Sequence, residues 1–356
     1  MIKKNFNSIW HYLTGLTSVP FKHLPKLFRS KWKELDAHFD SEEAKVIFSL
    51  VAFFLGSMPF NTPAVYSLLN YSELEHDGYW NVEGGMYKIT EEMVKLFKKK
   101  GVDIHYNVEI KGFDAPNGQL TAFVDGEGKR WEADIFVANA DAASFRGKIM
   151  QEAKYTEKKL DQMDWTWAPL TIYLGVKGKI DKLNHHNYFL RNNFREYTEN
   201  IFKTSVIPEK PYYYVNVSSK SNPECAPVGC ENLFVLCPIP DRRYKPDLQD
   251  AEKISDSILR DLSQRIDYDL QANTLTRKVM LPVEWEKEFN LYRGSGLGLA
   301  HGMNQVGWFR PSNKDEQYRN LFYVGASTIP GTGLPIVVIS SKLTVQRINQ
   351  DYGSII

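Results

Sequence analysis

The chain has 356 residues, which is enough for two or so domains with well-filled cores. Its 44 basic and 43 acidic residues nearly cancel, so no strong electrostatic field indicates a nucleic-acid partner, and none is expected. Cys225, Cys230 and Cys237 lack a C-x-x-C pair, and their odd number gives no complete disulfide set, so reduced thiols are the better interpretation.

The N-terminal stretch is basic and aromatic. Before the first acidic residue, Glu34, stand Lys3, Lys4, Lys22, Lys26, Arg29, Lys31 and Lys33, interleaved with Trp10, Tyr12, Phe21, Phe28 and Trp32. This pattern is typical of a segment at an anionic membrane surface; the alternative is a solvated helical face with aromatic core contacts. Because residues 1–14 lack the apolar region and cleavage site of a signal peptide, we predict a cytoplasmic, peripherally membrane-associated protein.

Residues 1–78 are predicted to be helical, with prolines as interruptions. Asp40-Ser41-Glu42-Glu43 has the composition of a helix start. The apolar run Val46 to Leu55 follows it, and this run is short of the roughly 20 residues that span a bilayer. It is therefore interpreted as a core helix, or as a helix that dips into one leaflet.

Residues 79–150 predict a helix and then strands. Gly84-Gly85-Met86 leads into a helix through Thr90 to Lys100, which Gly101 ends. Val102 to Ile110 alternates apolar and polar residues, the clearest strand pattern in the chain. Asn117-Gly118 marks a turn, and strands expected at 120–124 and 129–131 complete a small meander. The apolar run 135–137 suits a strand covered on both faces.

Residues 151–288 change character. Strands are predicted at 170–174, 187–190, 212–217, 233–236 and 278–282, separated by long polar connections. Residues 251–266 predict a helix with one apolar face. This pattern favours a mixed sheet that carries substrate, inserted between two pieces of a cofactor domain.

The last seventy residues hold the most informative pattern. Residues 290–298 read NLYRGSGLG, residues 307–311 read GWFRP, and residues 320–335 read NLFYVGASTIPGTGLP. The last string predicts a short buried strand at 321–324, a glycine-rich turn, and a helix from about 335 to 348. Glycines let the backbone approach a planar ligand, and a helix N-terminus offers unpaired N–H groups with partial positive charge. For the turn alone, an ordinary strand–turn–helix of an α/β fold is the alternative.

This C-terminal string resembles the signature of the carotenoid (phytoene or dehydrosqualene) desaturases, which are FAD-dependent flavoproteins. The resemblance implies an α/β (α+β), Rossmann-like FAD/NAD(P)-binding flavoprotein fold with an inserted mixed β-sheet substrate domain and a helical membrane or substrate region. The expected segments are a helical substrate or membrane region at 1–78, FAD-binding segments at 79–150 and 289–356, and a substrate-binding domain at 151–288.

The resemblance also implies site residues. Gly84-Gly85-Met86-Tyr87 matches the family's G-G-M-Y, Val108 matches a valine at the adenine end of FAD, and Asn139-Ala140-Asp141 matches a turn near the cofactor. Gly325-Ala326-Ser327 and Gly333-Leu334-Pro335-Ile336 match the segment that holds ribityl and isoalloxazine. The implied cofactor-binding residues are Gly85, Val108, Asn139, Gly325, Ala326, Ser327, Gly333, Pro335 and Ile336. Sheet packing for Val108, and shaping of a turn for Asn139 and Asp141, are the alternatives.

The implied chemistry is the desaturation of a linear carotenoid precursor such as phytoene or dehydrosqualene. A hydride passes from an allylic carbon to flavin N5 and a proton leaves the neighbouring carbon, while the protein orients the polyene isoprenoid and excludes water. Arg293 and His301 flank the glycine-rich stretch 295–299 and are candidate catalytic residues, with backbone support as the alternative. No clustered metal ligands stand in the sequence, and no metal is expected.

An enzyme of this type should open with a strand, a G-x-G-x-x-G turn, a helix and an acidic residue about 20 positions later. No such fingerprint stands in the sequence, and Gly294-x-Gly296-x-Gly298 has the wrong spacing. The chain is therefore interpreted as a truncated desaturase that lacks its first βαβ unit, with a separate N-terminal FAD-binding fragment as a further expected partner. The alternatives are a non-enzymatic fragment or apolar-ligand-binding module without flavin, and the carotenoid oxygenase or isomerase branch of the same family.

Overall fold

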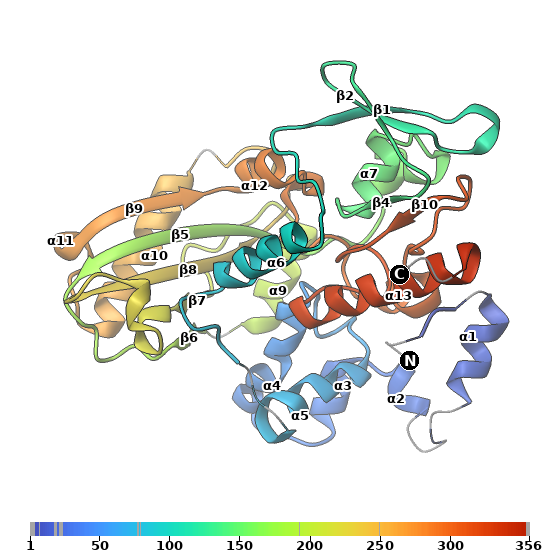
Figure 1. The fold of residues 1–356 in the computed structure, drawn as a ribbon. Helices are drawn as coiled ribbons and strands as arrows, with labels where there is room; N and C mark the ends of the chain where they lie inside the picture. Colours follow the sequence, from blue (N-terminus) through green and yellow to red (C-terminus); the bar gives the residue numbers. More distant parts are fainter. Residues whose placement is uncertain are drawn as a thin grey trace. The chain divides into compact units, whose positions relative to one another are not determined.

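The computed structural model describes residues 4–6, 8–17, 20, 24–76, 78, 80–191, 193–248 and 250–353. The chain divides into two compact units: unit 1 comprises residues 1–75, 107–166 and 289–356, and unit 2 comprises 76–106 and 167–288 (Figure 1). The segment 79–150, expected to be one piece of the cofactor domain, is thus divided between the units at residue 107. The functions assigned to the four predicted segments remain predictions. Every helix of the described residues is too short or too polar to cross a bilayer.

Unit 1 begins with helices, as predicted. They are α1 (Ile9–Leu16), α2 (Leu24–Phe28), α3 (Lys31–Asp36), α4 (Glu42–Phe54) and α5 (Ser67–Tyr71). Ser41 caps α4, because its hydroxyl accepts a hydrogen bond from the Ala44 N–H at 3.2 Å. The predicted apolar run lies mostly in α4, where Val46 and Phe53 are buried. Ile47 and Phe54 are 56% and 41% exposed, so this helix also presents apolar side chains to solvent.

The basic N-terminal surface needs one correction. Lys31 is fully buried and donates to Asn70 Oδ1 at 2.5 Å, and burial lowers its pKa to about 8. It therefore cannot contact a membrane surface. Lys26 and Arg29 form ion pairs with Glu34 at 2.6 and 3.2 Å. Three other residues of the predicted pattern lie outside the described residues: Lys3, Phe21 and Lys22.

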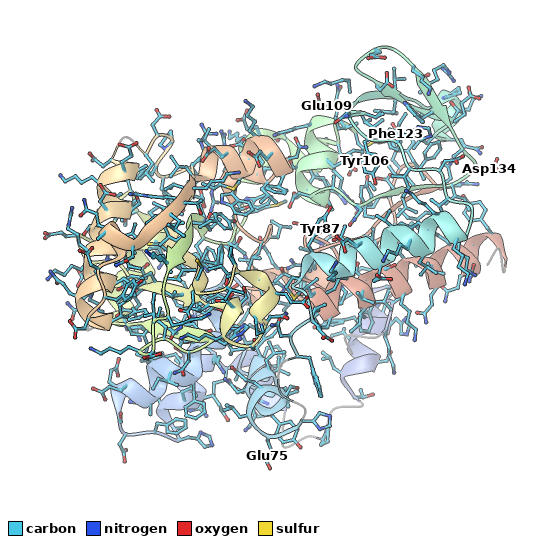
Figure 2. The ribbon with its side chains drawn as sticks, turned by 60° about the vertical axis from the view of Figure 1, so that its left-hand side comes forward. Glu75, Tyr87, Tyr106, Glu109, Phe123 and Asp134 are labelled. Carbon is cyan, nitrogen blue, oxygen red and sulfur yellow. The ribbon has the colours of Figure 1, made fainter. Side chains whose placement is uncertain are left out.

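Two small sheets follow in unit 1. The meander β1 (Ile110–Asp114), β2 (Ala122–Asp125) and β3 (Arg130–Glu132) is antiparallel, as predicted. The second sheet pairs β4 (Phe136–Ala138) with β10 (Leu321–Tyr323) in parallel. Phe123 of β2 is marked in Figure 2. The centroid of its ring lies 5.2 Å from that of the Phe136 ring and 5.7 Å from that of the Phe145 ring. The helices α7 (Ala142–Lys148), α8 (Glu157–Asp161) and α13 (Leu334–Tyr352) complete the unit.

Two strand predictions were wrong in part. The alternating segment 102–110 is a strand only from Ile110 onward, and Tyr106 and Val108 are 69% and 38% exposed. Alternation describes side chains, whereas a strand also needs a partner for its backbone hydrogen bonds, and no described strand pairs with residues 102–109. The strand β4, predicted to be covered on both faces, leaves Val137 49% exposed.

Unit 2 is built on one sheet, with strand order β6 (His186–Phe189), β7 (Tyr213–Asn216), β8 (Cys230–Ile239), β5 (Ala168–Lys177) and β9 (Thr274–Met280). Every pair is antiparallel, which corrects the prediction of a mixed sheet. The helix α10 (Ala251–Ile266) lies along this sheet and buries Ile258 and Leu262 in its core (Figure 1). The other helices are α6 (Tyr87–Lys99), α9 (Phe194–Lys203) and α11 (Leu270–Asn273), and α12 (Pro282–Phe289) leads back to unit 1.

Candidate functional site

Two turns that are far apart in the sequence meet at one edge of the parallel sheet in unit 1. Since β4 and β10 run in the same direction, with Ala138 opposite Tyr323, both strands end at this edge. The turn 139–141 follows β4, and the turn 324–327 follows β10. The Val324 N–H donates to the Ala138 carbonyl at 3.1 Å and ties the two turns together. The carboxyl ends of parallel strands are where ligands bind in open α/β sheets.

Asp141 joins the two turns through its carboxylate. It accepts from the Ser144 N–H at 2.8 Å, which caps α7, and from the Ser327 hydroxyl at 2.5 Å. The same hydroxyl oxygen accepts from the Leu299 N–H at 3.2 Å. Burial raises the pKa of Asp141, while the hydrogen bonds from Ser327 and Ser144 oppose that rise. Ser327, predicted as a cofactor ligand, therefore also holds the turn in shape.

Glycines let the backbone come close to its neighbours in this region. Gly325 has φ +121°, and a Cβ placed there would stand 3.2 Å from Asn139 Oδ1. Gly298 has φ +76°, and a Cβ would stand 2.2 Å from Ser327 Oγ. A larger residue would strain the backbone at both positions, and at position 298 it would also collide with Ser327. The glycine pattern of the C-terminal string is thus explained in part by packing of the turns themselves.

The start of α13 has the features of a ligand cradle. Gly333 is its N-cap residue, with φ +111°, and a Cβ there would meet nothing nearer than Ile336 Cγ1 at 3.5 Å. The N–H groups of Leu334 and Ile336 bond no described residue, and Pro335 has no N–H to offer. Leu334 and Val338 are 55% and 66% exposed, although both are apolar. An open glycine, free donors and the positive end of a helix fit an electron-rich edge of a planar group such as a flavin.

Arg310 cross-links the loops around this site. The sequence interpretation assigned it no role. It is buried and uses all five of its N–H donors on backbone carbonyls. Nε donates to Thr328 at 3.1 Å, Nη1 to Ala300 and Gln305 at 3.1 Å each, and Nη2 to Leu299 and Ala326 at 2.9 and 2.6 Å. Burial lowers its pKa to about 10. Arg310 therefore fixes the loop 299–305 to the glycine-rich turn 326–328. Its position in the quoted GWFRP string was the available signal.

Asp315 and Glu152 form an acidic cluster around the side chain of Tyr323 in β10. The Tyr323 hydroxyl lies 2.7 Å from Asp315 Oδ2 and 3.3 Å from Glu152 Oε1, and the Arg146 guanidinium lies 3.8 Å from the Tyr323 ring centroid. Burial and the nearby Asp315, opposed by Arg146, together raise the pKa of Glu152 to about 7. The pKa of Glu152 therefore lies close to neutral pH.

The two candidate catalytic residues are both engaged with the protein. His301 Nδ1 lies 3.3 Å from the Leu55 carbonyl, and its Nε2 accepts from the Thr332 N–H at 3.2 Å, which fits a neutral imidazole. Burial lowers its pKa well below the usual value. Arg293 pairs with Glu157 at 2.5 Å and Asp161 at 3.2 Å. These contacts fit the alternative of backbone support, and the catalytic assignment stays a prediction.

The two predicted ligands nearest the N-terminus, Gly85 and Val108, belong to neither the two turns nor the start of α13. Gly85 belongs to unit 2, with φ +94°, and a Cβ there would lie 3.5 Å from Cys225 Sγ. Val108 belongs to unit 1 but precedes β1 and pairs with no strand. Their cofactor roles stay predictions. The unit 1 residues Asn139, Gly325, Ala326, Ser327, Gly333, Pro335 and Ile336 lie on the two turns and the start of α13.

Comparison with known proteins identifies the family. No family model matches the chain. A zeta-carotene-forming phytoene desaturase from Myxococcus xanthus is 33% identical over 352 residues, which cover 98% of this chain and 67% of that protein. The chain belongs to the phytoene desaturase family of FAD-dependent oxidoreductases. A 4,4'-diapophytoene desaturase from a Methylomonas species is 28% identical over 358 residues, covering 99% of this chain and 69% of that one.

Across six curated relatives, this phytoene desaturase family member spans between 60% and 69% of their lengths. Among solved structures, a cyclohexylamine oxidase from Brevibacterium oxydans matches with a TM-score of 0.54 at 11% identity, covering 97% of this chain and 76% of that one. This likeness confirms the predicted fold class. The fit to FAD is partial in what the structure describes: the α13 cradle suits the flavin ring, whereas the sequence has no G-x-G-x-x-G turn for the pyrophosphate.

Proposed function

We propose that this chain is the larger part of a desaturase that uses FAD to introduce double bonds into a linear carotenoid precursor such as phytoene or dehydrosqualene. The observation that carries this proposal is the meeting of the turns 139–141 and 324–327 beside the open, donor-bearing start of α13. The names of the relatives from M. xanthus and Methylomonas support the substrate class. Since the chain spans about two thirds of the relatives' lengths or less, the activity belongs to the whole protein.

The bound flavin supplies the oxidation, in which an allylic carbon gives up a hydride and the neighbouring carbon a proton. This chain's residues hold and shape the site. The N–H groups of Leu334 and Ile336 would hold the electron-rich edge of the ring, and the positive end of α13 would stabilise negative charge there. Asp141 and Arg310 keep the turns rigid, so that the ring does not have to reorganise them when it binds.

On this proposal, the pyrophosphate end of FAD is held by a βαβ segment outside the sequence given, on the same or a separate polypeptide. A parallel sheet of two three-residue strands is small for independent stability. Val137 on β4 is 49% exposed and Val108 is 38% exposed, and further strands would cover such apolar surface.

Peripheral membrane attachment is the second part of the proposal, because a polyene dissolves only in lipid. Trp10 and Phe28 are each 74% exposed, and Leu68 is 64% exposed. These side chains lie on short helices of the N-terminal region and suit the interfacial layer of a bilayer. The ion pairs of Lys26 and Arg29 with Glu34 reduce the electrostatic share of that attraction.

The test is a reconstitution. The chain is mixed with, or joined to, a βαβ segment bearing a G-x-G-x-x-G turn, and is supplied with FAD and with phytoene or diapophytoene in liposomes. We expect products that absorb at longer wavelength as conjugated double bonds accumulate, resolved by chromatography and mass. Oxygenated or isomerised products would instead assign the oxygenase or isomerase branch. Bound flavin with no change in either polyene would contradict a desaturase, and polyene binding without flavin would favour the non-enzymatic module.

A further inference from the structure

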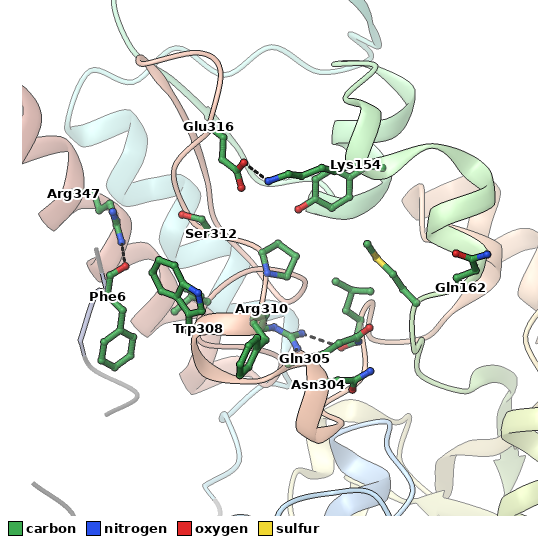
Figure 3. A pocket seen from close by; sticks show the side chains of 16 residues that line it. Phe6, Lys154, Gln162, Asn304, Gln305, Trp308, Arg310, Ser312, Glu316 and Arg347 are labelled. Carbon is green, nitrogen blue, oxygen red and sulfur yellow. Dashed lines mark hydrogen bonds and ion pairs between the residues drawn. The ribbon is translucent and has the colours of Figure 1, made fainter. Parts of the chain in front are cut away.

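Unit 1 contains a groove that the proposed function does not use. A groove of about 740 Å³ lies between the segments 154–163 and 304–316, with Phe6 and Arg347 at one end (Figure 3). This volume is within the range of small-molecule sites, which run from about 300 to 1,000 Å³. All of its lining residues belong to unit 1, so the groove is described within one compact body.

The groove carries an excess of positive charge. Arg310 and Arg347 both line it, and neither forms an ion pair with any described residue. The buried Arg310 bonds backbone carbonyls and is attracted by the Asp141 carboxyl. Arg347 is attracted by Asp351 and donates to Asn313 Oδ1 and the Phe6 carbonyl, both at 2.9 Å. Lys154 also lines the groove and pairs with Glu316, the single acidic side chain among the lining residues. The groove is thus lined by three cationic side chains and one acidic side chain, a balance that favours an anionic ligand.

Apolar side chains and spare donors accompany the charge. Trp308, Phe309 and Met163 form walls of the groove, and Phe309 is 60% exposed. The Trp308 indole N–H bonds no acceptor among the described residues. The Ser312 oxygen accepts from the Lys314 N–H at 3.1 Å, which leaves its own proton to donate. The lining thus offers aromatic surface, two neutral donors and net positive charge.

We propose that this groove binds an amphiphilic anion, a phosphate or carboxylate carried on an aromatic or other apolar body. The anionic group sits towards Lys154 and Ser312, and the apolar body packs on Trp308 and Phe309. Neither a bare inorganic anion nor a neutral aromatic satisfies both halves of the lining. The site is distinct from the α13 cradle, although Arg310, which lines the groove, also bonds the Ala326 carbonyl of the turn 324–327.

Isothermal titration calorimetry of the whole chain at low salt tests this with 1-naphthyl phosphate and 1-naphthoate as probes. We expect both to bind, and 1-naphthol and inorganic phosphate to bind at least about tenfold more weakly, a difference of about 1.4 kcal/mol. Equal affinity for 1-naphthol would overturn the anionic half of the site, and equal affinity for inorganic phosphate would overturn the apolar half. Absence of any naphthyl phosphate binding would remove the proposal entirely.

Variants locate the binding. Lys154→Gln and Trp308→Ala should each weaken naphthyl phosphate severalfold, with circular dichroism confirming that each variant is folded. Lys158→Gln is the matched control, because it removes one exposed positive charge that does not line the groove and should leave affinity unchanged. Gly333→Val, at the α13 cradle, should also leave it unchanged. Equal loss in Gly333→Val would assign the probe to the cradle, and wild-type affinity in both groove variants would rule out this groove.

Discussion

The two sheets that anchor the two units differ in how completely they are covered. The sheet of unit 2 has five described strands, two of them ten residues long, and buries Leu170, Ile172 and Val235 completely. The parallel sheet of unit 1 has two described strands of three residues and leaves Val137 half exposed. Long antiparallel strands with one packed face form a core from local pairings, whereas parallel strands need coverage on both faces. The candidate site lies at the less complete sheet, so rigidity there depends on side-chain contacts from loops.

The largest expected effect on stability comes from removing the contacts that Arg310 makes with the loop and the turn. Arg310→Met leaves up to five buried carbonyls without a charged donor, and each such bond contributes about 1.5–3 kcal/mol. The losses are not additive, and relief from burying a charge offsets part of them. We expect the free energy of unfolding to fall by several kcal/mol in chemical denaturation. The exposed Arg319→Met is the control and should change it by less than about 0.5 kcal/mol. Comparable stability in the two variants would show that the loop does not hold the turn.

Gly333→Val should act on the ligand rather than on the core. The exposed glycine with φ +111° has open space beside it, and valine would fill that space and strain the backbone. In a chain supplied with its βαβ segment, we expect loss of bound flavin and of polyene desaturation with the fold kept. His186→Ala, in the unit 2 sheet where His186 bonds the Tyr214 hydroxyl, is the control and should change neither. Full flavin content and activity in Gly333→Val would mean that the turn only packs.

The acidic cluster beneath β10 predicts a pH dependence of stability. Since the folded state raises the pKa of Glu152 from 4.5 to about 7, it binds more protons than the unfolded state between these values. The free energy of unfolding should therefore fall as pH rises from about 4.5 to about 7 and then level off. Glu152→Gln should flatten this part of the profile. A wild-type slope that persists in the variant would assign the effect to other groups.

The smallest effect is expected from the basic N-terminal residues. Flotation with anionic liposomes should carry the chain upward, and less so when Lys4, Lys26, Arg29 and Lys33 are replaced by Gln. The reduction should be modest, because an exposed cation contributes about 1 kcal/mol and two of these are paired with Glu34. Trp10→Ala tests the apolar part separately. Equal flotation with neutral and anionic vesicles would remove the electrostatic component.

Local signals in the sequence predicted most helices and strands. The apolar face of 251–266 predicted α10 with its observed bounds, and the turn chemistry of Asn117-Gly118 predicted the β1–β2 connection. The segment 102–110 failed because pairing depends on a partner strand that a local pattern does not specify. The mixed sheet failed for a related reason, since strand direction is set by connections and not by side-chain alternation.

Within the site, the glycine pattern predicted where the turns lie. It did not predict the hydrogen bonds that stabilise them. The resemblance placed Ser327 and Asn139 near the cofactor, and the structure adds that Ser327 and Asp141 bond each other at 2.5 Å. Arg310 was not assigned, because its five acceptors are backbone carbonyls from three separate stretches of chain. Any residue type can supply a backbone carbonyl, so the sequence at these positions does not reveal the contact. His301 was predicted as catalytic because it flanks the glycine-rich stretch 295–299, and nothing in the sequence indicated its ring contacts with the Leu55 carbonyl and the Thr332 N–H.

The most direct test of the account is the visible spectrum of the purified chain after incubation with excess FAD and desalting. The account predicts little or no bound flavin with the chain alone, because it has a cradle for the ring but no turn for the pyrophosphate. Addition of a βαβ segment with a G-x-G-x-x-G turn should then give a bound flavin band near one per chain. A stoichiometric flavin band with the chain alone, or no band after the segment is added, would contradict the division of the cofactor site proposed here.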